Sequence, residues 1–444
     1  KLGRPVRFIH DKDIDKGLLN FLVNRMNIDA KEDSVIAGGR YHNSKDFMGF
    51  PNLGTNELRD TKRKPLPHPD IDPKKSLFKM IRKKDIMLHF PYQSFHPIID
   101  FLREAAIDSK VEYIKVTIYR LAKQSNIINA LINARKNGKK VTAAIELQAR
   151  FDEAANIAWA KTLQENGIKV VHGQPGQKIH SKILLVGRRE RGKIKSYVSI
   201  GTGNFHEGTA KLYSDDNLLT SNSKITKEVE RVFRMIETGI PEKFKHLLVS
   251  PHDMYPKLLG FIDAEIANAK AGKEAYLLAK LNSLNDEGMI DKLYEASQAG
   301  VKIRLIIRGI CCLLPERTGL SENIEAISIV DKYLEHSRCY IFCNGGDEKV
   351  FISSADWMER NLHRRIEVSC PIYDPQIKSE LKKMLSIQLQ DNTKARWINH
   401  ERGVNIYKHT YGKSVRAQDT LYQYFQEKLK PSTETNGDKE NEGK

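Results

Sequence analysis

Two stretches determine the fold class of this chain: NARKNGKKVTAAIE (residues 133–146) and EASQAGVKIRLIIR (residues 295–308). In each stretch a helical pattern ends near a glycine, and an apolar, β-branched run follows it. Glycine is a common residue just past a helix, and β-branched residues favour strands. Because the same order occurs in two places, we interpret the chain as two copies of one α/β unit.

The first copy alternates between strand and helix patterns on both sides of its stretch. This alternation predicts a sheet covered by helices, with mostly parallel strands. The predicted helices are 97–107, 126–137 and 152–166, and the predicted strands are 112–119, 140–147, 168–172, 182–186 and 196–200.

The second copy repeats this order from about residue 249. Its predicted strands are 274–281, 301–307, 324–329, 338–342, 349–353 and 366–373, and its predicted helices are 289–298 and 376–389. Before the first copy, a helix is predicted over 14–26 and a strand over 35–41.

Four prolines between residues 65 and 73 resist regular structure and predict a domain boundary. The polar tail from residue 431 has no apolar residue to bury and is predicted to be disordered. The predicted domains are therefore a preceding segment (1–66), two α/β domains (67–248 and 249–430) and the tail (431–444).

The composition favours a globular protein with an anionic partner. Of 444 residues, 40% are hydrophobic and 29% are charged, which excludes wholesale disorder, collagen and a disulfide miniprotein. The net charge of +17 predicts binding to nucleic acid, an anionic membrane surface or phosphate groups. Five cysteines without a pairing framework indicate reduced thiols in a cytosolic protein. No apolar run is long enough to span a bilayer.

A histidine and a lysine lie at the start of a predicted strand in the segment KIHSK, residues 178–182. Strand side chains alternate, so His180 and Lys182 share one face. A neutral imidazole can attack phosphorus, and the neighbouring ammonium can hold a phosphate oxygen. The turn GTGN at 201–204 lets backbone N–H groups approach an anion.

The second copy has a corresponding histidine in LEHSR, residues 334–338, and SSAD (353–356) in place of GTGN. Two halves that face each other would bring His180 and His336 together, one as nucleophile and the other as general acid/base. Asp215 and Asp216 are adjacent in an extended segment and point to opposite faces, which favours a structural role over a shared cation site.

Three arginines lie where predicted strands end. Arg120 and Arg150 belong to the first copy and Arg308 to the second. Ligands of open α/β sheets bind outside the carboxyl ends of the strands, and arginine suits bidentate phosphate recognition. We therefore expect these arginines near a phosphate site.

Several motifs together resemble the type 1 family of bacterial polyphosphate kinases. They are FPYQSF (90–95), TIYRLA (117–122), ELQARFDE (146–153), KIHSKILLV (178–186), GTGNFHEGTAKLYSD (201–215), YLEHSR (333–338) and NGGDEKVFISSADWMERN (344–361). The resemblance covers about residues 1–430. It implies two tandem phospholipase D-like α/β domains with helices flanking mixed sheets. It also implies a fragment that lacks the family's amino-terminal domain and most of its head domain, of which IAGGRYHNSKDF (36–47) resembles the end.

The resemblance also implies residue roles. His180 would be the phosphohistidine nucleophile and His336 its partner in proton transfer. Tyr213, Arg308, His336 and Lys182 would bind the nucleotide. Arg120 and Arg150 match the family's arginines around the magnesium-bound phosphates. Since arginine has no acceptor for Mg²⁺, we expect them to hold the phosphates that carry the ion.

The implied reaction is the reversible transfer of the ATP γ-phosphate to polyphosphate, with Mg²⁺ and ATP/ADP as cofactors. The expected protein is a cytoplasmic homo-oligomer without nucleic acid, and peripheral membrane association stays open. One alternative is a phospholipase D-like phosphodiesterase. That family's His-x-Lys-x4-Asp motif is broken here, because Gly187 stands at the Asp position and Arg338 replaces Lys. The other alternative is a polyanion-binding module without turnover.

Overall fold

The computed structural model describes residues 8–28, 35–39, 51, 53–54, 60–122, 124–398, 406–409 and 412–430. The chain divides into two compact units, 1–62 and 63–444. The first contains strand β1 (Phe8–Asp11), helix α1 (Lys16–Arg25) and strand β2 (Val35–Gly38), and the two strands are parallel. The tail predicted to be disordered, the end of the predicted strand 35–41, and part of the motif 36–47 lie outside the described residues.

The second unit contains two sheets, each with strands contributed by both halves of the chain. Within the described residues the first sheet has eight strands, in the order β15-β10-β9-β8-β4-β5-β6 with β3 beside β10. Its strands are β3 (Ile86–Phe90), β4 (Val111–Ile118), β5 (Lys140–Ile145), β6 (Lys169–Val171), β8 (Ile183–Glu190), β9 (Lys193–Gly201), β10 (Tyr213–Thr220) and β15 (Leu334–Glu335).

The second sheet repeats this arrangement with nine described strands, in the order β11-β18-β17-β16-β12-β13-β14-β19 with β7 beside β18. Its strands are β7 (Lys178–Ile179), β11 (Leu248–Ser250), β12 (Tyr276–Leu281), β13 (Lys302–Ile307), β14 (Ile324–Ile329), β16 (Arg338–Phe342), β17 (Lys349–Ser353), β18 (Arg365–Pro371) and β19 (Ala395–Trp397). The repeated order confirms the predicted duplication into two tandem α/β domains with helices flanking mixed sheets.

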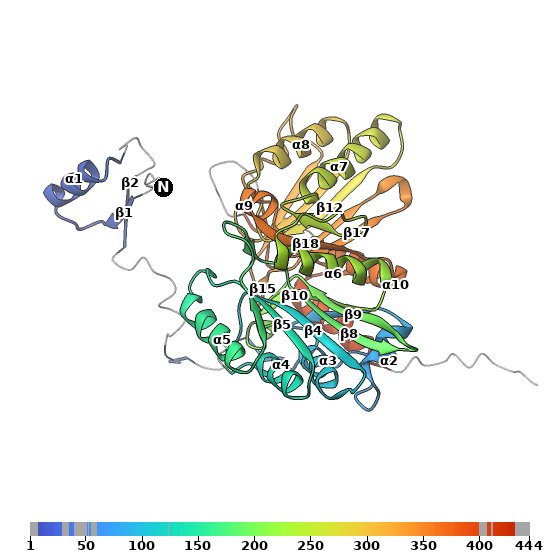
Figure 1. Ribbon diagram of the computed structural model, residues 1–444. Coiled ribbons are helices and arrows are strands. Elements are labelled where there is room, and N and C mark those ends of the chain that lie inside the picture. The colour runs from blue at the N-terminus through green and yellow to red at the C-terminus, as the bar shows by residue number, and fades with distance from the viewer. Residues whose placement is uncertain are drawn as a thin grey trace, which may run out of the picture. The chain divides into compact units, whose positions relative to one another are not determined.

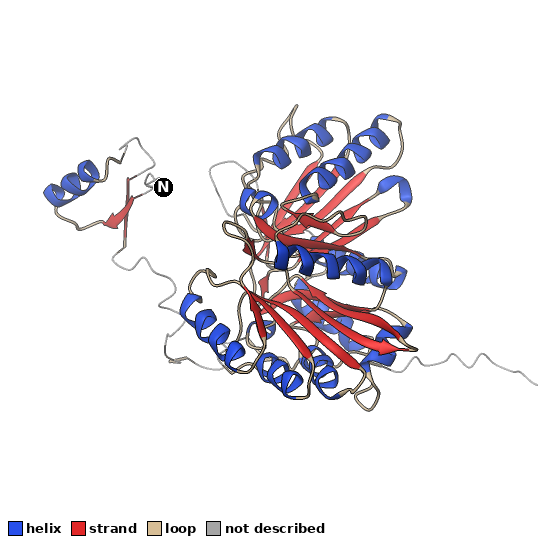
Figure 2. Ribbon diagram, in the orientation of Figure 1, coloured by secondary structure: helices blue, strands red, loops and turns tan. Residues whose placement is uncertain are grey.

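Helices cover the outer faces of both sheets, and further helices lie between the sheets (Figures 1 and 2). Helices α3, α4 and α5 lie outside the first sheet, α7 and α8 outside the second, and α6 and α10 between them (Figure 1). The helices are α2 (Leu77–Lys83), α3 (His96–Ile107), α4 (Asn126–Lys136), α5 (Glu153–Glu165), α6 (Ser223–Thr238), α7 (Met254–Lys270), α8 (Glu287–Gln298), α9 (Glu359–His363), α10 (Pro375–Leu389) and α11 (Ala417–Glu427). In the described residues, no helix is long and apolar enough to cross a membrane.

The apolar runs of the central strands are buried on both faces. In β8, Ile183 and Leu185 pack into the core between the sheets, whereas Leu184 and Val186 pack under the outer helices. This alternation is the period-2 pattern of a strand. Full burial on both faces explains why the sequence reads as a continuous apolar run instead of an alternating one.

The expectation of mostly parallel strands is wrong. Among the described strands of the two large sheets, parallel pairing is confined to β4-β5-β6 and β12-β13-β14 and to the short strands β7 and β15. Pairs such as β8-β9 and β16-β17 are antiparallel. Antiparallel neighbours need only short turns, and helices α4 and α5 provide the crossovers of the parallel part.

Two long helices, α6 and α7, were absent from the predicted elements. Helix α6 begins after the N-cap Asn222, whose side chain accepts from the Lys224 N–H, and ends at Gly239 with φ of 73°. Its charged residues conceal a regular apolar face, which packs into the core between the sheets. This face consists of Ile225, Val229, Val232, Phe233 and Ile236.

Candidate active site at the junction of the two halves

The two halves exchange the short strands that precede their histidines. Strand β7, just before His180, pairs with β18 of the second half, and β15, just before His336, pairs with β10 of the first. The His180 and Ser181 N–H groups donate to the Ile366 carbonyl at 3.0 and 2.8 Å. Each histidine is therefore positioned by backbone of the other half, and both lie at the junction, as the motif comparison predicts.

His180 is paired with a carboxylate that the sequence analysis missed. Its Nδ1 lies 2.7 Å from Oε1 and 2.9 Å from Oε2 of Glu367, a fully buried residue of β18. Glu367 also accepts from the Ser354 hydroxyl and the Asn361 amide, both at 2.5 Å. When Nδ1–H donates to this carboxylate, Nε2 keeps its lone pair free for nucleophilic attack.

Burial and nearby cations favour the neutral form of the His180 imidazole. Burial lowers its pKa well below the ordinary value, and the charges of Lys182, Arg365 and Arg338 lower it further. Burial also lowers the pKa of Lys182 to about 7 and raises that of Glu367. The lysine donates to the His180 carbonyl and lies 5.4 Å from the ring centre of Tyr119.

His336 has the matching arrangement with Asp215 of β10. Its Nδ1 lies 2.9 and 3.0 Å from the two Asp215 oxygens, and the Thr202 hydroxyl donates to Asp215 at 2.6 Å. Burial opposes ionisation of Asp215, but His336 and Thr202 outweigh it and hold its pKa below the usual value. A Cβ at Gly203 would lie 2.1 Å from this carboxylate, which explains the glycine in GTGN.

The second half has an arginine where the first has a lysine. Arg338 donates to the His336 carbonyl at 2.7 Å, as Lys182 does to His180. It also donates to both oxygens of Asp356, at 3.2 and 2.8 Å. Burial and Arg338 lower the pKa of His336, against the effect of Asp215.

Of the predicted nucleotide residues, Tyr213 lies beside His336, and Arg308 lies within electrostatic reach of Arg338. The ring centres of Tyr213 and His336 are 5.3 Å apart. Arg308 Nε donates to the Asn282 side chain at 2.9 Å. Burial and the charge of Arg338 lower its pKa, and Tyr213 and Glu335 also act on it. Tyr213 thus lies beside the second histidine, and Arg308 lies within electrostatic reach of Arg338.

The predicted phosphate arginines are near each other, but their guanidinium groups are separately engaged. Arg120 donates to the Arg150 carbonyl at 2.9 Å and pairs with Asp152 at 2.7 Å. Arg150 is exposed, and its guanidinium lies 4.9 Å from the ring centre of Phe151. Tyr119 connects Arg120 to the site, since its ring lies 4.7 Å from that of His180.

Magnesium does not fit these two arginines as direct ligands. A guanidinium only donates hydrogen bonds, whereas Mg²⁺ requires oxygen ligands. Among the described residues, no group of three or more His, Cys, Asp or Glu side chains is arranged to hold a metal ion. The phosphate-holding role of Arg120 and Arg150 stays a prediction.

The phosphodiesterase motif position at Gly187 has no room for an aspartate. A Cβ there would lie 2.2 Å from the Tyr113 ring. The Tyr113 hydroxyl also donates to Glu230 at 3.1 Å, which fixes the ring. The third residue of the His-x-Lys-x4-Asp motif is therefore excluded by packing in the first half.

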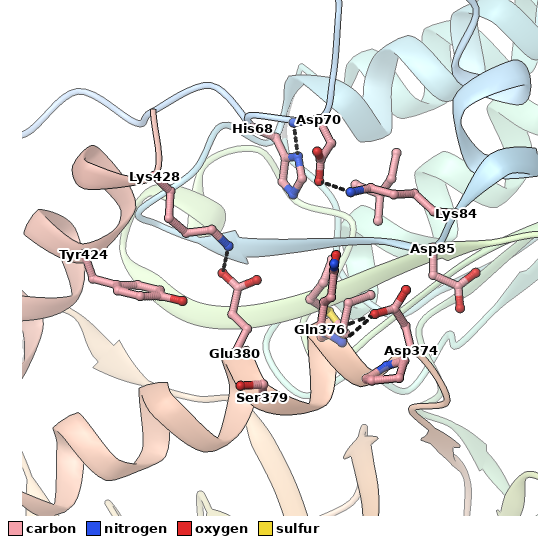
Figure 3. A pocket seen from close by; sticks show the side chains of 14 residues that line it. His68, Asp70, Lys84, Asp85, Asp374, Gln376, Ser379, Glu380, Tyr424 and Lys428 are labelled. Atoms are coloured by element: carbon pink, nitrogen blue, oxygen red, sulfur yellow. Dashed lines mark hydrogen bonds and ion pairs between the residues drawn. The ribbon is translucent and has the colours of Figure 1, made fainter. Parts of the chain in front are cut away.

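A cavity of about 500 Å³ lies elsewhere, between β3, α10 and α11 (Figure 3). Its charges are largely paired, Lys84 with Asp70 and Lys428 with Glu380, both at 2.7 Å. Burial lowers the pKa of His68 on its wall to about 4. Since the seven predicted site residues do not line it, we place the candidate site at the two histidines.

Sequence reasoning missed both carboxylates that orient the histidines. Glu367 is a lone acid in the buried apolar strand β18, which is itself a signal of a paired carboxylate. Asp215 and Asp216 do point to opposite faces, but each binds a histidine. Asp216 lies 2.7 Å from Nδ1 of His89. The predicted structural role therefore applies to Asp216, whereas Asp215 belongs to the candidate site.

Comparisons with known proteins agree with this architecture. Residues 76–242 match the family model for polyphosphate kinase C-terminal domain 1, and residues 247–418 match the model for C-terminal domain 2. The polyphosphate kinase of Vibrio vulnificus strain YJ016 is 49% identical over 422 residues, which are 95% of this chain and 60% of that protein. The chain thus spans about 60% of the length of the curated relatives it matches.

Solved structures give the same result for the fold. The polyphosphate kinase of Porphyromonas gingivalis matches with a TM-score of 0.85 and 41% identity, over 97% of this chain and 66% of that one. A phosphatidylserine synthase of Haemophilus influenzae Rd KW20 matches with a TM-score of 0.50 and 10% identity, over 78% of this chain and 94% of that one. The second likeness concerns the fold alone.

Proposed function

This chain belongs to the polyphosphate kinase family, and we propose that it transfers the γ-phosphate of ATP reversibly to the end of a polyphosphate chain through phosphorylated His180. The observation that carries the proposal is the His180–Glu367 pair, in which Nδ1 faces a buried carboxylate and Nε2 is left as nucleophile. The lowered pKa of His180 supports it, because only the neutral imidazole can attack.

The proposed reaction has two displacements at phosphorus. In the first, His180 Nε2 forms a bond to the γ-phosphorus while the bond to the bridging oxygen breaks and ADP leaves. In the second, a terminal oxygen of polyphosphate attacks the phosphohistidine and the P–N bond breaks. The reverse direction makes ATP from ADP and polyphosphate.

The cations at the junction support phosphoryl transfer. Lys182, Arg338 and Arg365 all act electrostatically on His180, so incoming phosphate would meet concentrated positive charge. Catalysis of phosphoryl transfer depends mostly on positioning and charge neutralisation. His336, oriented by Asp215, would exchange a proton with the nucleotide's leaving oxygen, and Tyr213 and Arg308 would bind the nucleotide beside it.

The test uses ADP and polyphosphate, with ATP as the readout, for wild type, His180→Ala and His336→Ala. We expect no ATP above background from His180→Ala and a large loss from His336→Ala. His96→Ala, at an exposed histidine that begins α3, is the matched control and should keep wild-type activity.

The second readout is the chemistry of the phosphorylated protein. Radiolabelled polyphosphate should give a label that is acid-labile and base-stable, and it should be absent from His180→Ala. Acid-stable label, or label retained by His180→Ala, would contradict the nucleophile assignment. Turnover of a phosphodiester without nucleotide would favour the phosphodiesterase alternative, and salt-sensitive binding without turnover the polyanion-binding one.

A further inference from the structure

The two exchanged strands carry different residues directly before their histidines. Ile179 precedes His180 and is packed in the apolar core between the sheets. Glu335 precedes His336 and is 1% exposed. A buried carboxylate at the position where the other half has isoleucine is costly unless it is fully paired.

Glu335 is paired on every side by buried groups, which we call the Glu335 cluster. Lys280 of β12 donates to it at 2.5 Å and Ser214 of β10 at 2.9 Å. Gln388 of α10 and Gln418 of α11 donate to its two oxygens at 3.0 and 2.7 Å. All five side chains belong to residues that are at most 4% exposed.

Gln418 also fixes the backbone that leads to His336. Its side-chain carbonyl accepts from the Tyr333 N–H at 2.9 Å, and its amide donates to the Tyr333 carbonyl at 2.9 Å. These two hydrogen bonds resemble those that the backbone of a neighbouring β-strand residue would make with Tyr333. The segment from Tyr333 to Glu335 is thereby held by α11 on one side and by β10 on the other.

Helix α11 is itself fixed against the first half. The Phe425 ring lies 5.2 Å from that of His89 and 5.6 Å from that of Tyr92. His89 in turn binds Asp216, the neighbour of Asp215 on β10. Helix α11 therefore contacts the segment that carries His336, and through His89 of β3 it is linked to the strand that carries its carboxylate.

Stability alone does not explain a buried charged cluster. Apolar residues of similar volume often replace a buried ion pair without loss of stability. The equivalent position of the other half holds Ile179, which packs in the apolar core. The directed hydrogen bonds of the Glu335 cluster instead fix the relative positions of the segments that they join. The cluster defines where β15 lies relative to β10, and this relation places His336 opposite Asp215.

We propose that Glu335 and Gln418 are positioning residues for His336, through which the carboxy-terminal helix α11 sets the geometry of proton transfer. This inference rests on the proposed function of His336. It assigns no contact with substrate to either residue, and its effect is confined to the step that His336 serves.

The experiment compares Gln418→Leu with wild type and with Gln426→Leu, an exposed glutamine of the same helix. The measured rate is single-turnover transfer from radiolabelled, phosphorylated protein to ADP. We expect Gln418→Leu to lower it roughly 10- to 100-fold, the scale of a small misplacement of a catalytic group. The KM for ADP and the final amount of label on His180 should stay within about twofold of wild type.

A merely structural role would lower label, binding and rate together, and that result would overturn the proposal. So would an unchanged transfer rate in folded Gln418→Leu. If this variant does not fold, Gln388→Leu removes the other glutamine donor to Glu335 and is judged by the same measurements.

A readout without activity separates this inference from the proposed function. NMR with 15N-labelled histidine reports the tautomer of His336, assigned by comparison with His336→Ala. We expect wild type to carry the proton on Nδ1 and Gln418→Leu to show a mixture. Wild type that takes no label would contradict the proposed function, and the His336 spectrum would still decide the positioning role. An identical spectrum in both proteins would overturn it.

Discussion

The His180 and His336 segments have the same backbone frame but different chemistry around it. Both follow an exchanged strand, and both pair with a carboxylate of the other half. Next to His180 the cation is Lys182, whose pKa is lowered to about 7 by burial. Next to His336 it is Arg338, which is bonded to Asp356 through two of its nitrogens. The two segments therefore share one backbone geometry, but their different cations give each segment its own charge behaviour.

The difference suits a division of labour. Lys182 forms no salt bridge within the described residues and its pKa is lowered to about 7, so a phosphate near His180 can supply a negative partner for it. Arg338 has its partner already, so His336 stays in a fixed electrostatic environment whether or not phosphate is present. The first segment is therefore suited to receive a charged group and the second to exchange a proton.

The largest expected effect is at the carboxylate of the first segment. Glu367→Gln should lower the rate of His180 phosphorylation by roughly 10³- to 10⁴-fold. The amide can donate to Nδ1, which places the proton on Nε2 and blocks the nucleophile. The measurement is the rate of acid-labile labelling by polyphosphate, with circular dichroism to confirm folding. Labelling within tenfold of wild type would mean that the carboxylate does not set the tautomer.

The corresponding substitution in the second segment should have a smaller effect, and it should act on a later step of the reaction. Asp215→Asn should slow transfer from phosphorylated protein to ADP by roughly 10²-fold, the scale of one general acid/base. Label on His180 should persist, since the role proposed for His336 is proton transfer. Asp216→Asn, which alters the neighbouring carboxylate on the opposite face, is the control and should change the transfer rate less than tenfold. If Asp215→Asn and Asp216→Asn slowed the transfer equally, the two faces of β10 would not differ in function.

The smallest effect concerns the pH dependence of Lys182. With its pKa lowered to about 7, the lysine is charged below that pH and neutral above it. If phosphate binds only the charged form, the apparent KM for polyphosphate should rise roughly tenfold between pH 6 and pH 8. Lys182→Arg should flatten this rise, because arginine stays protonated. If the KM for polyphosphate had the same pH dependence in wild type and in Lys182→Arg, residues other than Lys182 would provide the positive charge that binds phosphate.

Much of the fold was predictable because its signals are local. Gly138 and Gly300 mark the same helix end in the two copies, and the strands 324–329, 338–342 and 349–353 were predicted with their observed bounds. Helix α6 was missed although its apolar spacing is regular, because its many charges obscured it. The strand directions were wrong because pairing depends on which segments meet in space.

The two histidines were also predictable from local signals in the sequence, whereas the carboxylates that pair with them were not. His180 and Lys182 lie in one short motif, so local spacing points to both. Glu367 is separated from His180 by 187 positions and Asp215 from His336 by 121. Only the exchange of β7 and β15 between the sheets brings these pairs together, and short strands of this kind have no signal of their own in the sequence.

The exchange of strands also sets an order of events during synthesis. The segment that bears His180 is made early, but the Ile366 carbonyl and the Glu367 carboxylate that hold it belong to β18. Domains of a growing chain fold in sequence as they leave the ribosome. His180, the proposed nucleophile, is thus synthesised before the carboxylate that would set its tautomer, and the pair can form only after β18 has been made.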